Sequence, residues 1–147
     1  MRNKLGPALI NNKKEVDQIV DYVESRGGKV EFLKDNSNMV YNAFGGGKPG
    51  IIQVDENISI AALMHEFRHF KDDEKSGYIG LRVIANNDTF WKYEFNGYME
   101  ELKIARSIKA KDEVKQILKE MRKRKDEIYG NRWQSNLYVK FSKEWKR

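Results

Sequence analysis

The chain has 147 residues, a length that predicts one domain, residues 1–147, built around a single core. It contains no cysteine, which excludes disulfide bonds and thiolate metal sites, and no apolar run is long enough to cross a bilayer. The net charge of +6 is unevenly spread, because residues 102–147 carry 15 of the 28 Lys and Arg but only 6 of the 22 Asp and Glu.

The first residues do not have the pattern of a secretory signal, because charged residues and Pro7 interrupt them. We therefore expect a cytoplasmic protein, or one that is exported as part of a larger protein, without membrane insertion.

The first half of the chain predicts a helix followed by a small antiparallel sheet. Residues 12–25 place valine and isoleucine on one face, and Gly27-Gly28 ends that helix. Three short extended segments follow at residues 29–33, 39–44 and 50–54. The glycines at 45–47 and Lys48 predict a hairpin connection, since a phosphate-binding loop would continue with Ser or Thr and a helix. A flap over a cleft is the alternative for this connection.

The second half predicts three helices. The first spans residues 58–72, with Ser59 or Asn57 as its N-cap. The second begins at Asp88 or Thr89 and carries an apolar stripe, and residues 78–88 form a partly helical connection. The third covers about residues 111–128 and is basic outside. Side chains expected to face the core from the last two helices are Trp91, Phe95, Tyr98, Leu102, Ala105, Val114, Ile117, Leu118, Met121 and Ile128. We expect the aromatic residues of 133–145 to dock back on the core.

The first of these helices carries the only two histidines of the chain, in the sequence His65-Glu66-Phe67-Arg68-His69. Residues four apart lie one turn apart on the same face of a helix, so both imidazoles can reach one metal ion, with Glu66 beside it. This is the H-E-x-x-H pattern of zinc metallopeptidases. The alternative is that the two rings pack in the helix without a metal. Without cysteine, any Zn²⁺ here must take nitrogen and oxygen ligands, as catalytic zinc sites do.

A third ligand must come from a carboxylate elsewhere in the chain. Glu94 is favoured, because it lies beside the buried stripe of the following helix and so near the groove between the two helices. Glu101, two turns further along a nearby face, is the alternative. If Glu94 binds the metal, Glu101 could instead orient a ligand histidine.

These segments resemble a known class of enzyme. The order of a strand, the H-E-x-x-H helix and a later helix reading Glu94-Phe95-Asn96-Gly97-Tyr98-Met99-Glu100-Glu101 is similar to the zincin-like metallopeptidases of the gluzincin type. The small size resembles the compact metallopeptidase domains that occur as C-terminal toxin modules of bacterial polymorphic toxins and in phage proteins. The resemblance covers about residues 29–108 and leaves a basic helical extension at about 109–147. In the thermolysin-like pattern, Asn precedes the ligand Glu and Asp follows four residues after it, whereas Tyr93 and Tyr98 stand here.

The resemblance implies an α+β zincin core with His65, His69 and Glu94 as ligands of Zn²⁺ and Glu66 as the catalytic residue. Such an enzyme hydrolyses peptide bonds of a protein or peptide substrate, and an immunity protein would be a further partner of a toxin module. Glu66 would act as general base and acid toward water.

A second donor is needed for the developing oxyanion. Tyr98, Tyr93, Tyr78 and Arg68 are candidates, and Tyr98 is the one we favour. A peptide substrate would add as a strand to the edge of the sheet, at 39–44 or 50–54.

Two other functions compete with proteolysis. The basic run at residues 119–125 and the aromatic end could bind nucleic acid, although such a run is more often a solvated helix face. A zincin-like scaffold could also serve as an adaptor without proteolysis, but the presence of Glu66 argues against a site that has lost its activity.

Overall fold

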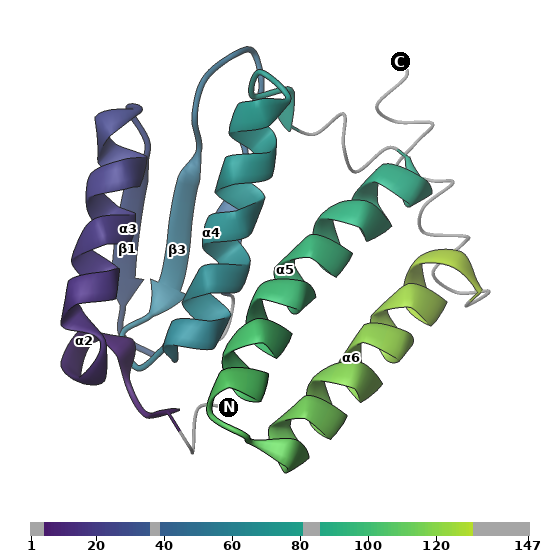
Figure 1. Cartoon of the computed structure of the whole chain (residues 1–147). Helices are drawn as coiled ribbons and strands as arrows, with labels where there is room; N and C mark the ends of the chain where they lie inside the picture. Colours follow the sequence, from purple (N-terminus) through teal and green to yellow (C-terminus); the bar gives the residue numbers. More distant parts are fainter. Residues whose placement is uncertain (1–4, 36–38, 81–85, 131–147) are drawn as a thin grey trace.

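The computed structural model describes residues 5–35, 39–80 and 86–130 (Figure 1). The predicted docking of residues 133–145 lies outside these ranges. The described elements, in chain order, are α2 (Ala8–Asn11), α3 (Lys13–Ser25), β1 (Lys29–Leu33), β2 (Val40–Asn42), β3 (Ile51–Asp55), α4 (Ile60–Lys75), α5 (Asn87–Ser107) and α6 (Lys111–Tyr129). The fold is therefore α+β, a three-stranded sheet followed by three long helices.

The sheet is mixed, so the prediction of an antiparallel sheet was wrong. The strand order is β1-β3-β2: β3 pairs parallel with β1 and antiparallel with β2. The physical reason is the composition of β3, whose Ile52 and Val54 are fully buried. In the centre of the sheet, this apolar strand pairs with a neighbouring strand along both of its edges. The shorter, half-exposed β2 lies at an edge of the sheet.

Helices α3 and α4 lie side by side against one face of the sheet (Figure 1). The predicted apolar face of α3 is buried through Val16, Ile19 and Val23. It meets the buried face of α4, where Leu63 and Phe70 are fully covered. This packing forms the main core and fixes how α4 is turned about its axis.

The caps of the two helices that carry the motif residues were predicted with different success. Ser59 caps α4, because its Oγ accepts a hydrogen bond of 3.2 Å from the amide of Ala62. Helix α5 begins earlier than expected, since Asn86, rather than Asp88 or Thr89, caps it through a 3.0 Å bond from the Thr89 amide. An Asn with extended backbone is an equally good cap, and the sequence alone does not choose between neighbouring cap residues.

Helix α5 packs along α4 on one side and along α6 on the other (Figure 1). A second apolar cluster joins α5 to α6 through Leu102, Ala105, Ile117 and Met121. Because α5 has two buried faces, its predicted single apolar stripe was wrong at Phe95, whose side chain is 41% exposed. The predicted core-facing stripe of α6 was wrong at Leu118, which is 42% exposed. No helix among the described residues is long and apolar enough to cross a membrane.

Candidate metal centre

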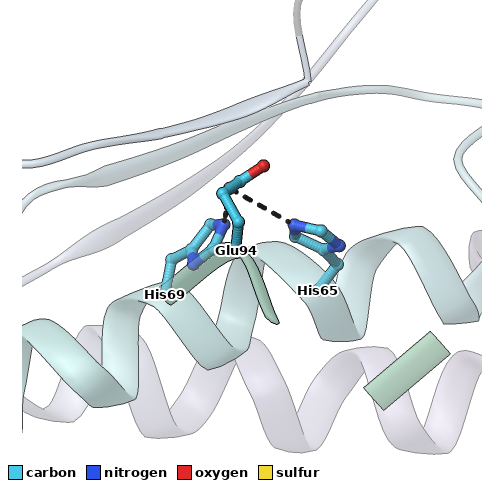
Figure 2. Close-up of side chains that lie close together, drawn as sticks. All are labelled: His65, His69 and Glu94. Carbon is cyan, nitrogen blue, oxygen red and sulfur yellow. Dashed lines mark ion pairs between the residues drawn. The ribbon is translucent and has the colours of Figure 1, made fainter. Parts of the chain in front are cut away.

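The two histidines lie one turn apart on the same side of α4, as the spacing predicts (Figure 2). Their rings meet edge to face with centroids 4.7 Å apart. The side chains of His65 and His69 are 9% and 14% exposed. Polar nitrogens that are shielded from water to this degree need partners, and these come from neighbouring carboxylates.

Glu94 reaches the histidines from α5 (Figure 2). Its Oε1 lies 2.9 Å from Nε2 of His69 and 3.7 Å from Nε2 of His65. One carboxylate oxygen and two imidazole nitrogens therefore converge, and the three ligand atoms lie within 4.8 Å of one another. Of the two predicted candidates for the third position, Glu94 is the one that lies near Nε2 of both histidines.

These residues fit a zinc ion by the chemistry of their donors. Two imidazoles and one carboxylate are the protein ligands of a known class of catalytic zinc sites, in which the fourth position belongs to water or substrate. Donors arranged tetrahedrally around one ion at about 2.0–2.2 Å lie about 3.3–3.6 Å apart. The separations of Glu94 Oε1 from the two imidazole nitrogens, 2.9 and 3.7 Å, lie on either side of this range, so a bound ion would require only small shifts of Glu94.

Glu101 holds His65 from the opposite side of the ring. Its Oε2 lies 2.7 Å from Nδ1 of His65, so Nε2 faces Glu94. This is the arrangement in which a carboxylate fixes the orientation and tautomer of a ligand histidine. The structure therefore places Glu101 where it can orient a ligand histidine, which is the role expected for it if Glu94 binds the metal.

The charges of this group perturb one another strongly. Burial lowers the pKa of His65, but its contacts with Glu101 and Glu94 more than offset this and raise the pKa to about 10. Burial likewise raises the pKa of Glu94, yet the two histidines bring it well below its ordinary value. A metal ion that binds Nε2 of His65 would therefore have to displace a proton from that nitrogen.

The ring of His69 is held less completely. Its Nδ1 is buried and has no hydrogen-bond partner within the described part of the chain. The contact of Nε2 with Glu94 is its one polar restraint among those residues, and a metal ion bound at Nε2 would take the place of that contact.

Glu66 lines the same cleft as the two histidines. Its Oε1 accepts a 3.0 Å hydrogen bond from the backbone amide of Tyr41 in β2. Burial raises the pKa of Glu66, although the nearby histidines partly counteract this effect. A carboxylate with a raised pKa and one fixed oxygen is suited to accept and return a proton near neutral pH.

The cleft that contains these residues has a volume of about 710 Å³. Its walls come from β2 and the segments beside it and from α4, α5 and α6, with Tyr41, Glu66, Tyr98 and Arg124 among the lining side chains. A space of this size matches ordinary ligand clefts. The group of His65, His69 and Glu94 therefore lies beside a cavity large enough for a ligand.

Of the four candidates for an oxyanion donor, Tyr98 is the one whose side chain packs on a histidine ring. Its ring packs edge to face on His65, with centroids 4.8 Å apart, and burial raises the pKa of its hydroxyl. Tyr93 also lines the cleft, but its hydroxyl donates to the carbonyl of Asp72. The other two point elsewhere: Arg68 binds Asp72 and Glu100, and the Tyr78 hydroxyl donates to Glu74.

Two further residues of the site were not found from the sequence. Gly97 faces the imidazole of His65 so closely that a Cβ there would lie 2.5 Å from Cδ2 and 2.6 Å from Nε2. A glycine inside a helix is itself a signal, because glycine destabilises helix interiors and stays where space is needed. Arg124 of α6 donates to the outer oxygen of Glu94. Arg124 lies in a basic run, and nothing in the sequence distinguishes it from the other basic residues there.

Comparisons with protein-family models, with curated proteins and with solved structures found no match. No family is identified for the chain. What stands is an α+β fold with a buried group of His65, His69 and Glu94 that could hold a metal ion.

Proposed function

We propose that the chain is a zinc-dependent peptidase. The observation that carries the proposal is the convergence of His65, His69 and Glu94 beside Glu66 in one cleft. A purely structural zinc site would fill all four positions with protein ligands. Here two nitrogens and one oxygen converge, and one carboxylate oxygen of a fourth side chain, Glu66, accepts a hydrogen bond from the amide of Tyr41.

The proposed reaction is the addition of water to a peptide carbonyl, followed by cleavage of the C–N bond. A bound zinc ion would supply Lewis-acid polarisation and lower the pKa of a water molecule. Glu66 accepts the proton that water loses as its oxygen bonds to the carbonyl carbon, and it returns that proton to the nitrogen of the leaving amine. The amide of Tyr41 keeps Glu66 in place through both transfers.

Strand β2 is the proposed docking edge for the substrate. It is an outer strand of the sheet, and residues from Met39 to Ala43 line the cleft. The second edge considered from the sequence, residues 50–54, is excluded, because β3 occupies the centre of the sheet and pairs on both sides. A peptide added beside β2 would lie near Glu66 and would be recognised mainly through its backbone.

Tyr98 is the proposed donor to the oxyanion. Its side chain lines the cleft and packs on His65. A tyrosine hydroxyl is already protonated at neutral pH, and burial raises the pKa of Tyr98 further. A neutral hydroxyl can donate a hydrogen bond to the charge that develops on the carbonyl oxygen.

The test is hydrolysis of an unfolded protein substrate by zinc-loaded protein, with and without a chelator. We expect cleavage that the chelator abolishes and zinc restores. Glu66→Gln should bind zinc as the wild type does and show no cleavage, because the amide cannot accept a proton. A zinc-loaded wild type that is no more active than Glu66→Gln would refute the proposal and leave a metal-binding adaptor.

A further inference from the structure

The side chain of Arg124 joins the C-terminal helix α6 to the carboxylate of Glu94. Its Nε donates to Oε2 of Glu94 at 3.2 Å. The other oxygen, Oε1, is the one that faces the two histidines. The two oxygens of Glu94 are thus divided between an arginine on one side and the imidazoles on the other.

Arg124 is itself held in place from two directions. Its Nη1 donates to Oε2 of Glu127 at 3.1 Å, and its guanidinium carbon lies 5.2 Å from the ring centroid of Phe90. The side chain is 35% exposed, which is little for an arginine in a helix with a solvated basic face. The fixed fork of a guanidinium makes such a contact directional, whereas a lysine would act as a point charge.

The contact of Oε2 with Arg124 affects how Glu94 can bind a metal ion. A carboxylate can coordinate through one oxygen or through both. Coordination through both would require Oε2 to turn toward the histidines and give up its bond from Arg124. With that bond intact, Glu94 offers Oε1 alone, and a fourth position remains for water or substrate.

We infer that Arg124 is a positioning residue that restricts Glu94 to one-oxygen coordination, so that α6 is part of the metal centre. This inference rests on the proposed zinc site and adds a role for a helix outside the segment that resembles zincins. The other basic residues of α6 offer a contrast, since Arg122 and Lys125 are exposed and contact none of the three ligands in the described structure.

The test compares Arg124→Met with Arg122→Met, which removes the same charge from an exposed position two residues away on the same helix. Zinc affinity is measured by competition with a chromogenic chelator. We expect Arg124→Met to bind zinc about 10- to 100-fold more weakly, the usual effect of removing a partner of a metal ligand. Arg122→Met should stay within about twofold of the wild type, as surface substitutions generally do.

A spectroscopic readout separates positioning from general weakening. Cobalt(II) absorbs visible light more strongly in four-coordinate than in five-coordinate sites. We expect a strong band in cobalt-loaded wild type and in Arg122→Met, and a weaker band in Arg124→Met, where both oxygens of Glu94 are released to the ion. Arg124→Lys should bind zinc more tightly than Arg124→Met but less tightly than the wild type.

Glu127→Gln keeps the inference testable if Arg124→Met does not fold, because it weakens only the anchor of the guanidinium. Glu127→Gln should lower the zinc affinity and weaken the cobalt band, each by less than Arg124→Met does. An unchanged cobalt spectrum and zinc affinity in the folded Arg124 and Glu127 variants would overturn the inference, and so would equal losses in Arg122→Met. Neither result would touch the peptidase proposal, whereas a wild type that binds neither ion would overturn both.

Discussion

The contact between Gly97 and His65 gives the sharpest prediction of the structure. Gly97→Ala places a methyl carbon 2.5 Å from Cδ2 and 2.6 Å from Nε2 of His65. Carbon and nitrogen atoms pack best at about 3.5–4.0 Å. The imidazole must therefore move by about 1 Å, or α5 must move away from α4 by a similar distance.

The ring of His65 has little freedom to move. Glu101 holds its Nδ1 at 2.7 Å, and the ring of Tyr98 packs with it in an edge-to-face contact. A zinc–nitrogen bond of about 2.0–2.1 Å does not tolerate a displacement of about 1 Å. We expect the affinity for zinc to fall by about 100-fold or more, since small misplacements of this size have effects of that order.

The stability of the metal-free protein should change much less. Alanine improves the helix propensity of α5 by about 1 kcal/mol relative to glycine. Overpacking in a well-filled region costs about 1–3 kcal/mol. The two effects leave a net loss of about 0–2 kcal/mol in the free energy of unfolding, so Gly97→Ala should remain folded.

The assay is a zinc titration together with thermal unfolding of the metal-free protein. Lys92→Ala, at an exposed position of the same helix, is the control and should leave both unchanged. If Gly97→Ala bound zinc as tightly as the wild type, the close approach of α5 to His65 would not govern the metal centre and our reasoning would fail.

The remaining predictions concern the other partners of the site. Glu101→Gln should weaken zinc binding about tenfold or more in the same titration, because the carboxylate that orients His65 loses its charge; an unchanged affinity would remove Glu101 from the site. Tyr98→Phe should lower kcat for peptide hydrolysis about 100-fold or more and change KM little, as expected for an oxyanion donor, and a change in KM alone would indicate a binding role. Burial lowers the pKa of His65, but Glu101 and Glu94 raise it to about 10. The stabilisation of the metal-free fold by the protonated His65 is therefore complete below pH 6.5 and is lost as the pH rises toward 10. Zinc affinity should therefore increase with pH across this window, and a flat profile would contradict the shift. Expression of the wild type should slow bacterial growth more than Glu66→Gln if the domain is a toxin module, and equal growth would count against that role.

Local patterns in the sequence were sufficient to predict helix α4 and the face that carries its two histidines. The spacing of His65 and His69 fixed their common face, and Ser59 was recognisable as a cap. Glu94 and Glu101 could also be predicted, because both lie near the face of α5 that meets α4. Each of these inferences depends on the geometry of one helix and on its neighbour along the chain.

Features that depend on packing between distant elements were missed. The parallel pairing of β1 with β3 arises because the chain passes to the far edge of the sheet before it returns, which no local pattern records. Arg124 became part of the site only through the packing of α6 on α5. The apolar periodicity of α5 likewise did not show that this helix has two buried faces.

The most direct test of the account is a crystal structure of the zinc-loaded protein with anomalous data collected at the zinc edge. We predict one anomalous peak per chain, about 2.0–2.2 Å from Nε2 of His65, Nε2 of His69 and Oε1 of Glu94. A peak at any other group of residues, or none after loading with zinc, would contradict it.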